Sequence, residues 1–420
     1  MGLEKYQNDM AGCSRCSSCK WVPFNQMKSW RFAKACPSIS RYNFHAYSGS
    51  GKMNMGLSML EGRSQLTDTV SDIIFHCNLC GACEVSCKIY RDDIDLGEVL
   101  EELRTYCVEQ GQLVPEHMAL IDALKREDNV FGEPKSERGA WADGLGLKDM
   151  NREKADILFH AGCRYSYDSE LSPIVKGAVE LMRRAGADIA VGGREEACCG
   201  GRAFELGYRG EMQNFADDMN SRVKASGVST LVTACSDCYS AFKYLYPRMG
   251  KELPVKVMHI TEFLSEAVDA GKLCFNRQVP MTVTYHDPCH LGRRSEPYLG
   301  EWEGDKLLRP MDRKRTGRKG IYGPPRHILE SIPSLELKEM ERIKEYAWCC
   351  GAGGGVLEAF PEFSAWTAME RIQEALSTGA DALVTACPWC TRSFRDAMST
   401  NGVRLPIYDI TEIAIQALGS

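Results

Sequence analysis

The chain has 420 residues, of which 44% are hydrophobic, with 20 cysteines and a formal net charge of −6 at pH 7. This length predicts about two to three domains that need no disulfide bonds to fold, and the negative charge argues against general nucleic-acid binding. The first ten residues lack the apolar core of a signal peptide, and no stretch approaches the ~18 apolar residues of a membrane span. We therefore expect a cytoplasmic protein with no direct membrane insertion.

Residues 1–110 contain two groups of closely spaced cysteines. Three cysteines at three-residue steps let a short loop wrap one face of a [4Fe–4S] cubane, and in two-cluster ferredoxins the fourth ligand comes from the other group. This rule predicts a ferredoxin-like, mostly helical domain in which one cluster takes Cys13, Cys16, Cys19 and Cys87 and the other takes Cys77, Cys80, Cys83 and Cys36. Zinc and redox-active thiols are the alternatives. The wide gap before Cys36 and the Lys88 that follows Cys87 depart from a compact ferredoxin, so the exchange of fourth ligands is a weaker prediction than the two clusters.

Residues 111–152 are predicted to be a helical connector. Apolar periodicity predicts helices at residues 96–110 and 115–125, and residues 67–75 are expected to form the helix before the second cysteine group. The segment 129–134 contains Gly132 and Pro134 and breaks regular structure. Cys107 lies on the apolar face of its helix, without a cysteine at ligand spacing, and is interpreted as a buried thiol.

The remaining chain carries the same five-cysteine pattern twice, and residues 230–238 (TLVTACSDC) parallel residues 382–390 (ALVTACPWC). A duplication is the natural interpretation, with pseudo-symmetric lobes at residues 153–275 and 276–420. Strand-like segments alternate with helix-like ones, which indicates parallel α/β units. The expected strands are 155–159, 187–191, 230–234, 281–285, 335–337 and 382–386, and the expected helices are 173–185, 211–226, 241–249 and 365–377.

Each cysteine group follows a predicted strand, and ligands of open α/β sheets bind at the carboxyl ends of strands. Glycine lets a backbone pass close to a bulky group, and glycines follow both Cys-Cys pairs: Gly200 and Gly201, then the run that includes Gly351 and Gly353. Five thiolates in each lobe exceed the four ligands of zinc, which favours an iron–sulfur cluster of unusual shape.

The chain resembles the heterodisulfide reductase B/D-type iron–sulfur proteins, a family that includes iron–sulfur subunits of glycolate and lactate dehydrogenases. The motifs that carry the resemblance are residues 287–293 (DPCHLGR), residues 349–355 (CCGAGGG), and a connector with Asn129, Gly132, Arg138 and Trp141. The resemblance implies up to two noncubane [4Fe–4S] clusters. One would take Cys163, Cys198, Cys199, Cys235 and Cys238, and the other Cys289, Cys349, Cys350, Cys387 and Cys390. A conventional cubane with one spare cysteine is the alternative in either lobe.

His286 and His290 flank Cys289. They are candidates for hydrogen-bond donors to cluster sulfur or for proton donors, and packing against the glycine loop is the alternative. The second lobe also has a basic insertion at residues 300–326. We interpret it as a solvated loop, with docking of an acidic partner as the functional alternative.

The predicted function is electron transfer between the ferredoxin-type clusters and the lobe clusters, within an anaerobic oxidoreductase complex. No flavin or nicotinamide fingerprint is present, so a partner flavoprotein or a larger reductase must supply that chemistry, and a ferredoxin is a further candidate partner. The second hypothesis is catalytic reduction of a small heterodisulfide at the lobe clusters. A zinc- or thiol-based binding scaffold is a third.

Overall fold

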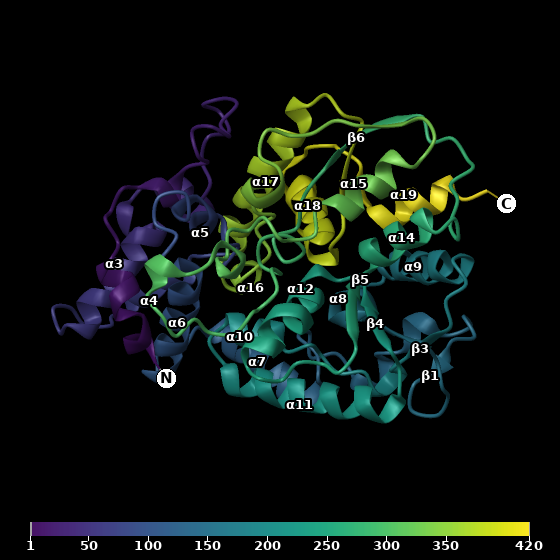
Figure 1. Ribbon diagram of the computed structural model, residues 1–420, viewed down its shortest axis with the longest axis horizontal. Coiled ribbons are helices and arrows are strands. Elements are labelled where there is room, and N and C mark those ends of the chain that lie inside the picture. Colours follow the sequence, from purple (N-terminus) through teal and green to yellow (C-terminus); the bar gives the residue numbers. More distant parts are fainter. Residues whose placement is uncertain (1, 420) are drawn as a thin grey trace.

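The computed structural model describes residues 2–419, and it combines helices with two parallel β-sheets, as the α/β prediction requires (Figure 1). Helices α3–α6 gather at one side of the two lobes, and the second lobe lies above the first in this view. No helix within residues 2–419 is both long enough and apolar enough to cross a membrane.

The N-terminal region is helical. Thr67 accepts a hydrogen bond from the Val70 amide and so begins α4, and proline at the first helical position begins α2 and α7. Cys107 is buried in the core of this region, as its place on the apolar helix face predicts. The helices are α1 (Gln7–Ala11), α2 (Pro37–Tyr42), α3 (Gly49–Leu60), α4 (Asp68–Phe75), α5 (Ala82–Cys87), α6 (Leu96–Glu109) and α7 (Pro115–Glu127).

The first lobe is built on a five-stranded parallel sheet in the order β1-β3-β2-β4-β5. The central strands are rich in apolar residues that are buried on both faces of the sheet. In register, Leu158 pairs with Ala190 on one neighbouring strand and with Leu231 on the other. The strands are β1 (Lys148–Asp149), β2 (Ile157–His160), β3 (Ile189–Val191), β4 (Thr230–Thr233) and β5 (Lys256–His259). The helices are α8 (Gly162–Tyr167), α9 (Ser172–Arg184), α10 (Gly201–Glu205), α11 (Arg209–Ser226), α12 (Ser236–Ser240), α13 (Tyr246–Arg248) and α14 (Ile260–Asp269).

The second lobe repeats this plan with a four-stranded parallel sheet in the order β7-β6-β8-β9. Its strands are β6 (Met281–Tyr285), β7 (Leu335–Leu337), β8 (Ala382–Thr385) and β9 (Ile407–Asp409). Its helices are α15 (Gly323–Glu330), α16 (Val356–Ala359), α17 (Pro361–Ser377), α18 (Pro388–Asn401) and α19 (Ile410–Ala417). The repetition extends to the last helix of each lobe, because His259 and Asp409 each form a capping box with a glutamate three residues later.

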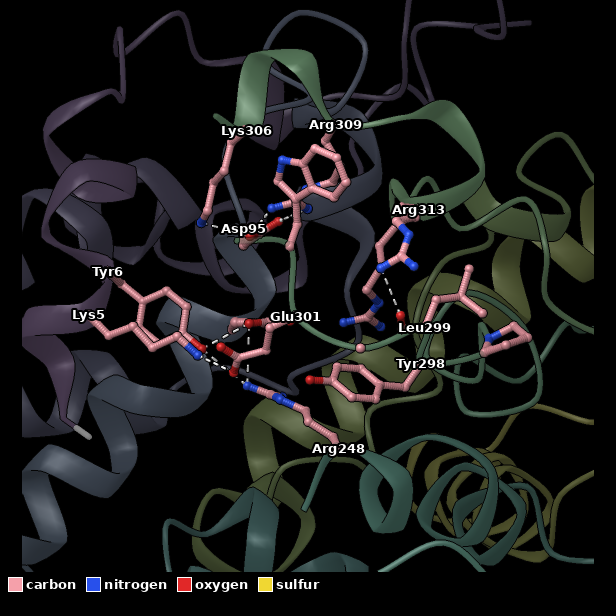
Figure 2. Close-up of a pocket in the computed structure, with 15 residues that line it drawn as sticks. Lys5, Tyr6, Asp95, Arg248, Tyr298, Leu299, Glu301, Lys306, Arg309 and Arg313 are labelled. Carbon is pink, nitrogen blue, oxygen red and sulfur yellow. Dashed lines mark hydrogen bonds and ion pairs between the residues drawn. The ribbon is translucent and has the colours of Figure 1, made fainter. Parts of the chain in front are cut away.

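The basic insertion is not the solvated loop that the sequence predicted. Lys306 lies 2.8 Å from both Asp9 and Asp95. Arg309 binds Asp95 through two hydrogen bonds of 2.8 and 2.9 Å (Figure 2). Lys314 reaches Asp92 at 2.5 Å. The insertion is thus a strap that binds the N-terminal helices, and acidic residues of the same chain take up much of the charge that docking of an acidic partner would need.

Candidate metal centres

One set of cysteines lines a small cavity at the surface of the N-terminal domain: Cys13, Cys16, Cys19 and Cys87. Arg15 and Ser17 have left-handed backbone conformations (φ 56° and 68°), which L side chains adopt only at a cost. They turn the loop after α1 so that its three cysteines meet the last residue of α5. Cys16 is the exposed member of the set.

A second set lines a more deeply placed cavity: Cys36, Cys77, Cys80 and Cys83. Leu79 and Gly81 have positive φ angles and wrap the loop that precedes α5. The Lys52 side chain is buried beside this set, and its ammonium group donates to the Tyr47 carbonyl at 2.8 Å. Burial lowers the pKa of Lys52, whereas Cys77 and Cys36 act to raise it.

The third set belongs to the first lobe, and all five of its cysteines are buried. Each of them lies in the segment that follows the carboxyl end of β2, β3 or β4. Their thiols lie next to one another in a series that runs through Cys163, Cys198, Cys199, Cys238 and Cys235. A Cβ atom on Gly162 would lie 2.8 Å from the Cys238 sulfur, so only glycine fits there.

The fourth set repeats this series in the second lobe through Cys289, Cys349, Cys350, Cys390 and Cys387. A buried cavity is lined by four of these cysteines together with Asp237, His290, Gly353 and Trp389. His286 also faces this set, because one of its ring nitrogens and the sulfurs of Cys350 and Cys390 all lie within 4.8 Å of one another. The His286 Nδ1 atom accepts a hydrogen bond from Arg371 at 3.1 Å, which leaves Nε2 to carry the proton.

The glycines after the Cys-Cys pairs have more than one role. The amides of Gly200 and Gly351 donate to the sulfurs of Cys198 and Cys349 at 3.4 and 3.3 Å, a contact that both lobes share. Gly201 packs near Cys199. Gly353 lines the second-lobe cavity, yet a Cβ atom there would lie 2.7 Å from the Asn78 carbonyl. The glycine run therefore also leaves room for the backbone of the N-terminal domain to approach closely, a role that the sequence did not predict.

Neighbouring sets touch at single thiols. Cys80 of the second set lies beside Cys349 of the fourth, and Cys387 of the fourth set lies beside Cys235 of the third. The structure thus arranges three sets in the spatial order second, fourth, third, which differs from their order along the chain.

His290 lies between buried Glu205 and half-buried Asp237 of the first lobe. Its Nε2 lies 2.7 Å from Glu205 and its Nδ1 lies 3.1 Å from Asp237. Burial alone would lower the pKa of His290, but Asp237, the Cys289 thiolate and Glu205 together raise it well above its usual value. The two carboxylates therefore favour the protonated form of His290 beside Cys289.

Two arginines contribute contacts that the sequence motifs did not assign. Arg138 of the connector donates to the Cys163 sulfur at 3.3 Å and pairs with buried Glu196 at 3.0 Å. Arg293 donates to the backbone carbonyl of Cys80, across the boundary between the second lobe and the N-terminal domain. Both arginines belong to motifs that carry the family resemblance, and these motifs are the feature of the sequence that could have identified them.

The donor atoms fit iron–sulfur clusters better than zinc. All four sets consist of soft thiols, and each lobe gathers five of them. Hydrogen bonds from neighbouring thiols lower the pKa of Cys199 and Cys350 well below the usual value, so the arrangement favours thiolates at equivalent places in the lobes. Backbone N–H···S contacts of the kind made by Gly200 and Gly351 are among the features that tune iron–sulfur centres.

Known proteins share these regions. Residues 157–243 and 283–395 match the CCG cysteine-rich domain, and residues 9–89 match a 4Fe-4S dicluster domain. Every cysteine of the four sets lies within a matched region.

Three relatives illustrate the similarity. The chain is 29% identical over 419 residues to a subunit of the dihydromethanophenazine:CoB–CoM heterodisulfide reductase of Methanosarcina acetivorans, covering 98% of this chain and 94% of that protein. It is 26% identical to a subunit of the fumarate reductase (CoM/CoB) of Methanothermobacter marburgensis, covering 95% of this chain and 71% of that protein. It is 27% identical to the EtfAB:quinone oxidoreductase of Syntrophomonas wolfei, covering 85% of this chain and 48% of that protein.

Proposed function

Because the chain is one of the CCG-domain iron–sulfur proteins related to heterodisulfide reductase, and its domains are of the [4Fe–4S] type, we propose that it is an electron-transfer subunit of an anaerobic oxidoreductase complex. When bound, [4Fe–4S] clusters take up and release single electrons. We assign the first and second cysteine sets to two cubanes, and the third and fourth sets to two clusters that we propose are noncubane.

The contacts between sets are the observation that carries this proposal. The proximity of Cys80 to Cys349 and of Cys387 to Cys235 brings the ligands of three centres together. The first set opens at the surface through Cys16. We therefore propose that electrons enter or leave at the first set, and that the first lobe is the far end of the path.

The partner in this proposal is a flavoprotein or a larger reductase. This assignment is supported by the relatives whose names describe reductase subunits and an EtfAB:quinone oxidoreductase. Co-purification from the native host under anaerobic conditions, with mass spectrometry of the proteins that elute together, tests it. A flavoprotein in that fraction is expected, whereas elution of the chain alone with full iron content contradicts it.

Metal analysis and spectroscopy test the cluster assignment. We expect about sixteen iron atoms and as many acid-labile sulfides per chain, for four clusters of four irons. Cys36→Ser is expected to remove the signal of the second centre and to slow reduction of the lobe centres by a protein donor, as followed by electron paramagnetic resonance. Colourless protein with zinc and no sulfide contradicts the proposal.

A second candidate function is reduction of a small disulfide, and the buried cavity beside His290 favours it. The cavity brings four second-lobe cysteines against His290, which two carboxylates contact and which could supply a proton to a thiolate product. The balanced reaction takes two electrons and two protons and yields two thiols. Disulfide-dependent oxidation of a reduced viologen dye by the fully loaded protein supports this function, and His290→Gln is expected to slow it. No oxidation above the blank excludes it.

A further inference from the structure

The stretch from residue 10 to residue 60 has no aspartate or glutamate, although the whole chain has a net charge of −6. It begins after Asp9 and ends before Glu61. Its basic residues are Arg15, Lys20, Lys28, Arg31, Lys34, Arg41 and Lys52. An excess of one sign of charge along so long a stretch steers the approach of oppositely charged molecules.

Most of these cations remain free of acidic partners, unlike those of the strap. Arg31 pairs with Glu370 at 2.6 Å, and Lys52 is buried. Within residues 2–419, no carboxylate lies within ion-pair distance of the other five: Arg15, Lys20, Lys28, Lys34 and Arg41. Burial, followed by the charges of Lys20 and Arg15, lowers the pKa of His45, which places these three residues on one part of the surface.

Large apolar side chains project from the same stretch. Residues 20–35 form a hairpin, in which the Val22 amide donates to the Ala33 carbonyl at 2.8 Å, and its loop extends beyond the N-terminal helices and contacts α17 through Arg31 (Figure 1). Trp30 is 77% exposed, Phe24 71% and Phe44 64%. Aromatic residues are enriched in protein interfaces relative to the rest of the protein surface.

This basic and aromatic surface adjoins the solvent-exposed cysteine set. Cys16 is exposed, and Lys20 directly follows Cys19. The side chain of Ser50, in α3, approaches Cys19 and lies 3.1 Å from the His45 ring. A molecule that binds at Lys20 and Arg15 therefore also lies at the opening of the first set.

We propose that the surface formed by residues 15–45 is the docking site of an acidic electron-transfer protein. The proposal rests on the function proposed above and adds the place and the charge of the partner. One electron leaves the reduced partner, which is oxidised, and arrives at the centre held by the first cysteine set, which is reduced. The free cations attract the partner's carboxylates, and the exposed aromatic residues form the dry centre of the contact.

An anionic lipid surface has a similar affinity for lysine and tryptophan, but it explains less of this arrangement. Phospholipid supplies no electrons, and a bilayer pressed against this surface would close off the first set from any protein donor. The proximity of the charges to Cys16 therefore favours a protein over a membrane.

The experiment measures how fast the fully loaded protein is reduced by an acidic low-potential ferredoxin, in stopped-flow mixing at low and high salt. One variant reverses the surface charge with Lys20→Glu and Lys34→Glu, and another removes an apolar anchor with Trp30→Ser. The matched control reverses two exposed lysines of the first lobe with Lys224→Glu and Lys272→Glu. Reduction by dithionite, with iron and sulfide content, reports whether the clusters themselves are intact in every variant.

We expect the wild-type rate with ferredoxin to fall as salt rises, and the Lys20→Glu/Lys34→Glu variant to react about tenfold more slowly at low salt. Trp30→Ser is expected to slow the reaction at all salt concentrations, while the control variant and all rates with dithionite stay unchanged. Equal rates in the wild type and the charge variant overturn the proposal. Sedimentation of the wild type with phosphatidylglycerol vesicles that Trp30→Ser abolishes also overturns it, in favour of a membrane. If the wild-type protein contains no iron, the proposed electron-transfer function is refuted, rather than the docking site alone.

Discussion

Arg138 and Cys163 meet at 3.3 Å, with the arginine Nη1 donating to the cysteine sulfur, and this contact joins the connector to the first lobe. The same guanidinium holds Glu196, so a buried cation and a buried carboxylate are balanced beside the third cysteine set. The equivalent cysteine of the second lobe, Cys289, has His290 beside it. The two lobes thus share a ligand pattern and differ in the charges around it.

We predict that Arg138→Met lowers the reduction potential of the first-lobe centre. Loss of a positive charge and of an N–H···S hydrogen bond destabilises the reduced state, and about 1.4 kcal/mol corresponds to roughly 60 mV for one electron. Redox titration followed by electron paramagnetic resonance measures the shift. Because the substitution leaves Glu196 unpaired, the Arg138→Met/Glu196→Gln variant serves as the folding control, and Arg138→Lys is expected to restore part of the potential. An unchanged potential in all three variants contradicts the prediction.

We predict that Asp95→Asn loosens the strap and destabilises the protein by about 3–5 kcal/mol, the usual cost of leaving buried charges without their partner. The Asp95 carboxylate forms ion pairs with Lys88, Lys306 and Arg309. The substitution removes the negative charge that these three cations share. Thermal unfolding and limited proteolysis of residues 300–326 report the effect. Glu301→Gln, which removes only the exposed pair with Lys5, is the control and is expected to cost at most about 1 kcal/mol. Similar results for both variants would mean that the strap depends on other contacts.

We predict that Gly354→Ala weakens the contact between the second lobe and the N-terminal domain. A Cβ atom there would lie 2.7 Å from the Cys77 carbonyl oxygen, and φ is +63°. Gly402 has φ +65° but nothing within 4 Å of its Cβ position, so Gly402→Ala measures the backbone cost alone, about 1 kcal/mol. Gly354→Ala should lower the melting temperature more than Gly402→Ala does, and it should slow reduction of the lobe centres. Equal losses in the two variants would remove the steric argument.

We predict a pH-dependent stability that depends on Asp409. Burial raises the pKa of Asp409 to about 7 in the folded protein, from its usual value of 3.8. The folded state therefore holds the proton more tightly, so this contribution to stability is complete below pH 3.8 and is lost as the pH rises through 7, by at most about 1.4 kcal/mol per pH unit. Asp409→Asn keeps a good helix cap and should flatten the profile between about pH 4 and 7 in thermal unfolding. Parallel profiles for the wild type and the variant refute the assignment.

The sequence predicted local features well, because they depend on neighbouring residues. The strand at residues 281–285 and the helices expected at residues 173–185 and 211–226 follow from apolar patterning, and the structure contains them as β6, α9 and α11. Helix α17 begins at Pro361, four residues before the predicted start, because proline at the first helical position begins a helix that periodicity alone detects only later. The family resemblance and the [4Fe–4S] domains also follow from motifs that are local in sequence.

What the sequence did not reveal are contacts between distant segments. The partners of the strap, Asp9, Asp92 and Asp95, lie more than 200 residues before it, and periodicity gives no pairing between them. The acidic cluster at residues 92–95 is the feature of the sequence that could have indicated a partner for the basic insertion. The role of Arg138 was hidden in the same way, because its distance from Cys163 in sequence resembles no ligand spacing.

The contact between Asn78 and Gly351 also constrains how the protein is made. Asn78 donates to the Gly351 carbonyl at 2.8 Å, and the two residues are 273 positions apart. A ribosome therefore completes the second cysteine set long before the surface that covers it exists. Cluster loading in the N-terminal domain has this interval in which to occur, and arrival of the second lobe then closes the site, so truncated chains should leave these thiols open to oxidation.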